Sequence, residues 1–157
     1  MKRNVFLSVL YAFALVLMLG GLSSCEQAGC TNPFSDNYNP EATTDDGSCV
    51  LSREKFIAQY TVAESCPSGN FTFEINLVAG STGDDAVIIN NLGDFGAAVN
   101  ATVNGTSITI PNQNITASGV ALSINGSGSI NGTLLIINYS YNFAGGGETC
   151  TMNCTKR

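Results

Sequence analysis

The sequence contains no histidine and no tryptophan. The missing histidine removes the commonest general base and metal ligand of enzymes, and it excludes Ser-His-Asp and Cys-His catalytic sites. Charged residues make up only 11% of the chain, well below the ~25% that is usual in soluble domains. The net charge of −6 argues against nucleic acid as a partner, because binding phosphates needs a basic surface.

The N-terminus has the parts of a secretory signal. Residues 1–4 are short and basic, residues 5–19 form a mostly apolar run without charge, and small residues precede Cys25. This run is shorter than the ~20 residues of a membrane-spanning helix, which disfavours a permanent transmembrane segment. Leu22-Ser23-Ser24-Cys25 resembles the bacterial lipobox, which implies that Cys25 carries lipid and begins the mature protein. The alternative is an ordinary signal peptide with a chance cysteine.

The resemblance to the lipobox implies a cell-envelope address. Glu26 follows the lipid-bearing cysteine, whereas aspartate at that position is the best-known signal for inner-membrane retention, so an outer-membrane location is favoured. We divide the chain into a signal peptide (residues 1–24), a tether with a Cys-bounded acidic loop (residues 25–54) and one β-rich domain (residues 55–157).

The tether contains a segment that is bounded by cysteines and rich in turn-forming residues. Residues 29–49, GCTNPFSDNYNPEATTDDGSC, resemble a short motif of bacterial cell-surface and secreted proteins, roughly GCTDPxAxNYNPxAxxDDGSC, which implies a module near the membrane or between domains. Because Cys30 and Cys49 bound this segment, we pair them in a disulfide. Its polar residues either form turns alone or bind calcium, which takes about six to eight oxygen ligands. The candidate calcium ligands are Asp36, Asn37, Asn39, Asp45 and Asp46.

From Lys55 onward, apolar and polar residues alternate with a period of two, which predicts half-buried β-strands. Asn104-Gly105 and Asn131-Gly132 predict two-residue type I′ hairpin turns. No helical pattern follows the signal peptide. About eight strands are predicted, near residues 56–65, 70–78, 86–91, 97–104, 106–111, 119–128, 133–143 and 148–156.

Short hairpins between consecutive strands predict an all-β antiparallel meander. Because open strand edges promote aggregation, we expect the ends to meet in a closed, eight-stranded up-and-down barrel, with a β-sandwich as the alternative. By strand count and connectivity the domain resembles the lipocalin-like, or calycin, group. The Gly-x-Trp signature of lipocalins is absent, since the chain has no tryptophan.

Closure of the barrel predicts the second disulfide. The first and last strands would lie side by side and antiparallel, which places Cys66 beside Cys150. Cys154 then lies roughly opposite Val62 and stays a reduced, buried thiol. Pairing Cys66 with Cys154 would need a shift of several residues, and a Cys150–Cys154 bridge is disfavoured because residues four apart in a strand are ~13 Å apart.

Two regions of the domain are candidates for ligand binding. The irregular stretch from Asn90 to Gly96 is one, and Asp84, Asp85 and Asp94, which flank one predicted strand, are candidate ligands for a cation or a hydroxylated molecule. The other is an apolar pocket inside the barrel, although a filled core is favoured because eight strands leave just enough room for side chains. The candidate pocket residues are Tyr60, Phe73, Tyr139 and Tyr141.

These observations favour a membrane-anchored envelope lipoprotein that binds or scaffolds an envelope partner and is not an enzyme. The alternative is a lipocalin-like carrier of a small apolar ligand, which an interior cavity of roughly 300 Å³ or more would favour. A carboxylate-based glycosidase is the third hypothesis, and it needs two carboxylates ~5–9.5 Å apart. Glu64, Glu74 and Glu148 are available, but Glu74 lies on the outward register and the others lie at strand ends. No cofactor is expected, apart from calcium if the tether binds it.

Overall fold

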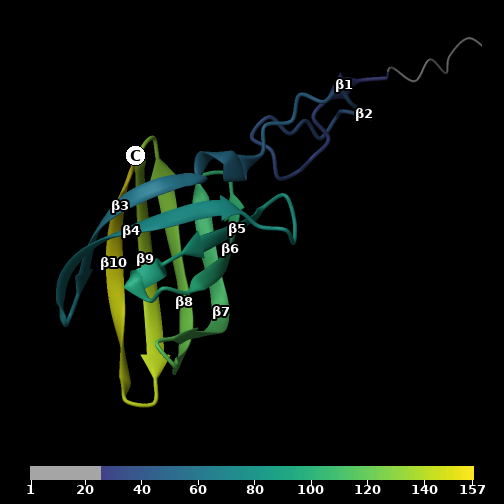
Figure 1. Cartoon of the computed structure of the whole chain (residues 1–157). Coiled ribbons are helices and arrows are strands. Elements are labelled where there is room, and N and C mark those ends of the chain that lie inside the picture. The colour runs from purple at the N-terminus through teal and green to yellow at the C-terminus, as the bar shows by residue number, and fades with distance from the viewer. Residues whose placement is uncertain (1–25) are drawn as a thin grey trace, which may run out of the picture.

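The computed structural model of the chain describes residues 26–157; the predicted signal peptide and the predicted lipidation site Cys25 lie outside the described residues. The chain forms a closed, all-β barrel of eight antiparallel strands, which confirms the predicted fold, and a small module from residues 26–51 projects from one end (Figure 1). The elements are β1 (Ala28–Gly29), β2 (Thr44–Asp45), η1 (Ser52–Lys55), β3 (Ala58–Cys66), β4 (Gly69–Ala79), β5 (Ala86–Asn90), η2 (Leu92–Asp94), β6 (Ala98–Asn104), β7 (Ser107–Ala117), β8 (Val120–Asn131), β9 (Leu134–Phe143) and β10 (Gly146–Lys156).

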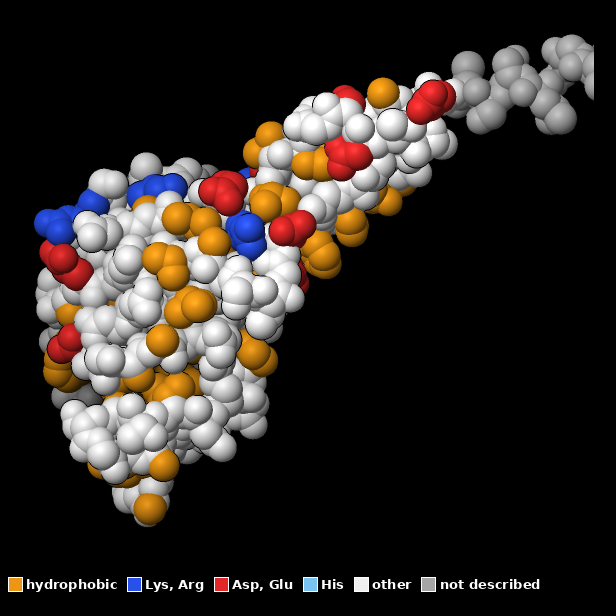
Figure 2. Space-filling view, turned by 45° about the vertical axis from the view of Figure 1, so that its right-hand side comes forward, with side chains coloured by type: hydrophobic (Ala, Val, Ile, Leu, Met, Phe, Trp, Pro, Cys, Tyr) orange, Lys and Arg blue, Asp and Glu red, His pale blue; other side chains and the backbone are white. Residues whose placement is uncertain are grey.

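The module is held together by the predicted disulfide between Cys30 and Cys49, whose Cα atoms are 4.9 Å apart, and by the short parallel pair β1–β2. Figure 2 shows it as a narrow extension of the barrel, with Lys and Arg side chains near the junction. At this junction the Asp36 carboxylate accepts hydrogen bonds from Ser52 Oγ and Lys55 Nζ, both at 2.6 Å. These bonds fix the module to η1, which leads directly into the barrel.

Each strand pairs with its neighbours in sequence, and β10 pairs with both β9 and β3, which closes the barrel. The β6–β7 and β8–β9 connections are two-residue hairpin turns, as the sequence predicts. The predicted type I′ geometry is wrong, because it needs a positive φ at both central residues. In each turn only the glycine has one, 58° at Gly105 and 57° at Gly132, and it is followed by a threonine. Glycine at the first central position is the pattern of type II′ turns.

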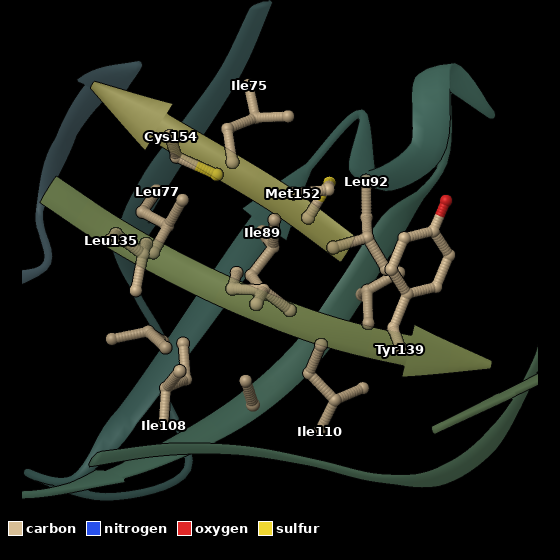
Figure 3. Packing of buried hydrophobic residues seen from close by; sticks show 14 of the residues in the cluster. Ile75, Leu77, Ile89, Leu92, Ile108, Ile110, Leu135, Tyr139, Met152 and Cys154 are labelled. Carbon is tan, nitrogen blue, oxygen red and sulfur yellow. The ribbon is translucent and has the colours of Figure 1, made fainter. Parts of the chain in front are cut away.

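Alternating side chains of the strands fill the barrel interior, as the period-two pattern predicts. On β3, for example, Tyr60 and Val62 are fully buried, whereas Thr61 between them is exposed. Figure 3 shows how apolar side chains from different strands, including Leu77, Ile89, Ile110 and Leu135, meet within the barrel. Each fully buried aliphatic side chain contributes about 1.5–3 kcal/mol relative to its exposed state, so this packing is the main source of stability.

Both ends of this core are capped by residues from irregular segments. Phe56 follows η1 and is fully buried at the end from which the module projects, here called the tether end. Leu92 of η2 is fully buried at the opposite end, here called the mouth. The β3–β4, β5–β6, β7–β8 and β9–β10 connections form the mouth.

The pairing of β3 with β10 has the register that the sequence predicts. Cys154 lies opposite Val62, and Cys66 forms a disulfide with Cys150 at a Cα–Cα distance of 4.4 Å. Cys154 is a buried free thiol, and burial, together with the nearby Glu64 carboxylate, raises its pKa to about 12. Cys154 is therefore protonated at physiological pH and unreactive.

Loss of the Cys66–Cys150 disulfide should destabilise the barrel strongly. The bridge spans 84 residues of sequence, and a closed loop of that length is worth about 4 kcal/mol in the chain-entropy model. We expect the Cys66→Ala/Cys150→Ala variant to lose about that much free energy of unfolding in urea titrations. The matched control is Cys30→Ala/Cys49→Ala, which removes a bridge outside the barrel and should leave the unfolding midpoint of the barrel unchanged. Equal effects of the two pairs would contradict this prediction.

Candidate functional site

A pocket of about 420 Å³ opens at the mouth of the barrel, between η2, the β3–β4 turn and the end of β9. Its walls carry two carboxylates, Glu64 and Asp94, and no Lys or Arg lines it. The rest of its surface is largely aromatic, from Phe71, Phe73, Phe95, Tyr139 and Tyr141. Leu92 of η2 is fully buried in the core and does not line the pocket.

Glu64 is the central polar residue of the pocket. It is near the end of β3, points inward with Tyr60 and Val62, and is only 6% exposed. The Tyr139 hydroxyl on β9 donates a hydrogen bond to Glu64 Oε1 at 2.7 Å. This bond joins two strands that are separated by β10, so it depends on the closure of the barrel.

The surroundings of Glu64 oppose its ionisation. Burial raises the pKa of the carboxyl, the hydrogen bond from Tyr139 lowers it, and the negative charges of Asp94 and Glu148 raise it further. The net result is a pKa above the ordinary value for glutamate. Burial and the Glu64 carboxylate likewise raise the pKa of Tyr139, so its hydroxyl is a permanent hydrogen-bond donor.

Four aromatic rings form a continuous cluster at the mouth. The rings of Tyr139, Tyr141 and Phe143 stack successively along β9, with centroids 6.3 and 6.4 Å apart. Phe95, which follows η2, packs edge-on against Tyr141 at 5.1 Å and against Tyr139 at 6.4 Å. Three of these rings, those of Phe95, Tyr139 and Tyr141, line the pocket.

The loop that contains η2 has an unusual backbone. Asn91, Gly93 and Asp94 all have positive φ, at 68°, 61° and 57°. The Asn91 side chain stabilises this conformation by accepting a hydrogen bond from Gly96 N and donating to Glu74 O. A Cβ on Gly93 would collide with the Tyr139 hydroxyl and with the Phe95 ring, so glycine lets the loop approach the Tyr139–Glu64 pair. Strained backbone of this kind concentrates at functional sites.

The structure brings together three of the four aromatic residues that the sequence nominates. Phe73, Tyr139 and Tyr141 line the mouth pocket. Tyr60 does not line this pocket, because it is fully buried in the core, where its hydroxyl donates to Phe56 O at 2.8 Å. Its inward register is correct, but its position on β3 places it deeper in the barrel than the pocket.

The three aspartates that flank β5 do not share a site. Asp94 lies at the mouth, whereas Asp84 and Asp85 precede β5 and therefore lie at the tether end. There Asp84 accepts a hydrogen bond from Asn32 Nδ2 of the module at 2.6 Å. The three candidates therefore cannot act together, because residues before and after a strand lie at opposite ends of a barrel.

The proposed calcium ligands are engaged in turns and in the junction with the barrel. Asp45 and Asp46 accept hydrogen bonds from the backbone N–H groups of Gly47 and Ser48, and Asn39 accepts one from Glu41 N. Asn37 links to Ser48 O and Val50 N, and Asp36 binds Ser52 and Lys55 as described above.

These side chains therefore take part in turns and in the junction with the barrel, which is the first of the two interpretations of this segment, and calcium binding stays a prediction. The only cluster of metal-ligand types among residues 26–157 is Glu64, Cys66 and Cys150, and its two sulfurs are joined in the disulfide.

The three glutamates considered for glycoside hydrolysis have separate environments. Glu74 is exposed on the outer wall and pairs with Arg157 at 2.6 Å. Glu148 accepts a hydrogen bond from Ser68 Oγ at 2.8 Å near the mouth, and Glu64 binds Tyr139. Sequence reasoning placed Glu64 merely at a strand end and missed its role in the pocket. The sequence signal that could have identified Glu64 as a pocket residue is its inward register, which it shares with Tyr60 and Val62.

The raised pKa of Glu64 predicts a pH dependence of stability. The folded protein binds this proton more tightly than the unfolded chain, so the free energy of unfolding falls as pH rises from the ordinary glutamate range through the raised pKa. A glutamine in place of Glu64 would accept the same hydrogen bond without ionising. Glu64→Gln should therefore become progressively more stable than wild type as pH rises across this window.

Urea unfolding of both proteins between about pH 4 and about pH 8 measures this difference. Glu74→Gln is the control, because its exposed side chain should give no comparable trend. A stability difference between Glu64→Gln and wild type that stays constant, or that shrinks with rising pH, would contradict the assignment.

No helix among residues 26–157 is long and apolar enough to cross a membrane. No protein-family model matches this chain, and no curated protein matches it either.

Proposed function

We propose that this chain is a lipid-anchored lipoprotein of the bacterial outer membrane, whose barrel binds a small molecule at its mouth without catalysing a reaction. The observation that carries the proposal is that the two ends of the barrel differ. The module that follows Cys25 joins the tether end, and the pocket opens at the opposite end. A lipid on Cys25 would therefore hold the barrel with its mouth directed away from the bilayer.

The packed interior supports binding at the mouth rather than transport of a long apolar molecule in a deep calyx. Tyr60, Leu77, Ile89, Leu92 and Leu135 are fully buried in the core, and none of them lines the pocket. A pocket of about 420 Å³ suits a small ligand that reaches only the rim of the barrel. The lipocalin-like carrier that the sequence suggests would therefore hold its ligand in a shallow site at the mouth and not deep inside the barrel.

The arrangement of polar groups supports binding over catalysis. The chain has no histidine. Glu64 is hydrogen-bonded to Tyr139, Glu148 to Ser68, and Glu74 is on the outer wall with Arg157. A glycosidase would need an acid and a base or nucleophile on either side of a bound sugar. An aromatic pocket with one oriented carboxyl is instead typical of ligand recognition.

A second candidate function is scaffolding, and the module favours it. Phe34, Tyr38 and Val50 are 44%, 43% and 54% exposed, so the module presents apolar side chains to solvent (Figure 2). Exposed aromatic residues are enriched at protein interfaces. This surface would suit an envelope protein near the membrane, and it does not compete with a ligand at the mouth.

Substitution of the lipid-bearing cysteine tests the anchor. Cys25→Ala should abolish labelling with a radioactive or clickable fatty acid and release the protein into the soluble fraction, because no thioether can form. Ser24→Ala keeps a small side chain before the cleavage site and should still be labelled. Retention of unlabelled Cys25→Ala in the membrane would contradict this part of the proposal.

Native mass spectrometry tests the pocket. Protein purified from envelopes in detergent should carry an extra small mass if the mouth is occupied in the cell. Phe73→Trp enlarges a ring that lines the pocket from the inward face of β4 and should remove that mass, whereas Thr61→Trp, on the exposed face of β3, should retain it. Absence of any bound small molecule in the wild-type protein, or its retention in Phe73→Trp, would count against binding at the mouth.

A further inference from the structure

Charge is distributed unevenly along the barrel axis. The four cationic side chains among residues 26–157 lie at the tether end: Arg53 donates to Gly83 O, Lys55 to Asp36 and Gly105 O, Lys156 to Lys55 O, and Arg157 follows β10. The mouth has the opposite character. Glu64, Asp94 and Glu148 lie there, and both Asp94 and Glu148 raise the pKa of Glu64 by their negative charge. The mouth therefore attracts cations and repels anions.

The pocket also offers the aromatic surfaces on which organic cations bind. Phe95, Tyr139 and Tyr141 lie within 6.4 Å of one another, centroid to centroid, next to the two carboxylates of the pocket. A ring face carries negative electrostatic potential, so a partly desolvated ammonium group is attracted to it. Apolar groups of the same ligand would cover the ring of Phe73 and the half-exposed ring of Phe71.

Glu64 is placed to receive the charged group of such a ligand. It is only 6% exposed, yet its carboxyl lines the pocket. Tyr139 occupies one lone pair of Oε1, and an ionised carboxylate has several further acceptor positions. A buried carboxylate without a positive partner is costly, and a cation in the pocket would remove that cost. Asp94 from η2 lines the same pocket, and Glu148 from β10 acts on Glu64 by its charge, so both add to the attraction.

We infer that the mouth pocket recognises a small organic cation, namely an amine carried on an apolar body. This inference rests on the proposed binding function and names its ligand class. The ammonium group lies against Glu64 and the rings of Tyr139 and Tyr141, and the apolar body covers Phe73 and Phe71. Fatty acids and other anions are rejected, because their carboxylate would meet Glu64 and Asp94 in a pocket without a cation.

The test compares three probes of similar shape and different charge: 2-phenylethylamine, 2-phenylethanol and phenylacetate. Calorimetric titration of the full-length, lipidated protein in nonionic detergent should give an affinity for the amine at least about tenfold higher than for the alcohol, and weaker binding still of the acid. Affinity for the amine should fall as pH is lowered through the pKa of Glu64, since the proton competes with the ligand for the carboxylate.

Two variants locate the interaction. Glu64→Gln keeps the acceptor for Tyr139 and should lower the affinity for the amine about tenfold, while affinity for the alcohol stays the same, which also shows that the pocket is intact. Glu74→Gln removes an equal charge from the outer wall and should change neither affinity.

Equal or tighter binding of the alcohol or the acid in wild type would overturn the cation class but leave binding at the mouth standing. If none of the three probes binds although the protein carries a native ligand mass, the cation class is likewise overturned and binding at the mouth still stands. Lack of both probe binding and a native ligand would overturn the proposed function as well.

Discussion

The pairing of the first barrel strand with the last is the constraint on which the other features depend. Every other strand pair is joined by a connection that is local in sequence, whereas β3 and β10 must meet across nearly the whole domain. The Cys66–Cys150 disulfide lies at one end of this seam. Once the seam closes, Glu64 of β3 comes within hydrogen-bond distance of Tyr139 on β9. The candidate site is thus a product of closure and does not exist in any single hairpin.

Closure also decides where a ligand can bind. Eight strands enclose a space that side chains can fill, and here they fill it with Leu, Ile, Val and Tyr. The free volume is displaced to the rim, where Leu92 caps the core and Phe95 lies over Tyr139 and Tyr141. The position of a residue along its strand therefore decides whether its side chain packs in the core or lines the pocket. Tyr60 and Glu64 share a strand and a face, but four residues separate a core tyrosine from a pocket carboxyl.

Much of the fold could be predicted from the sequence, because the signals that specify it are local. The period-two alternation of apolar and polar residues located the strands. The register that alternate residues share in the first and last strands placed Cys66 beside Cys150 and Cys154 opposite Val62. The site was less predictable. The Glu64–Tyr139 contact depends on the stagger across β10, which no local pattern encodes. In the tether the sequence pattern leaves two interpretations open, because the same Asp and Asn side chains serve calcium loops and turns.

The chemistry of Glu64 bears on why a carboxyl occupies this position. Its hydrogen bond from Tyr139 needs only an acceptor oxygen, which a glutamine of the same length would supply. The folded protein instead keeps an acid whose ionisation is opposed by burial and by the charges of Asp94 and Glu148. Packing gives no account of that cost, because the core beneath is complete and capped by Leu92. The proposed positively charged ligand would account for it, since its charge would stabilise the ionised carboxyl that the surrounding protein disfavours. The same arrangement would give specificity, because an anion at the mouth would add to the repulsion that Glu64 already experiences.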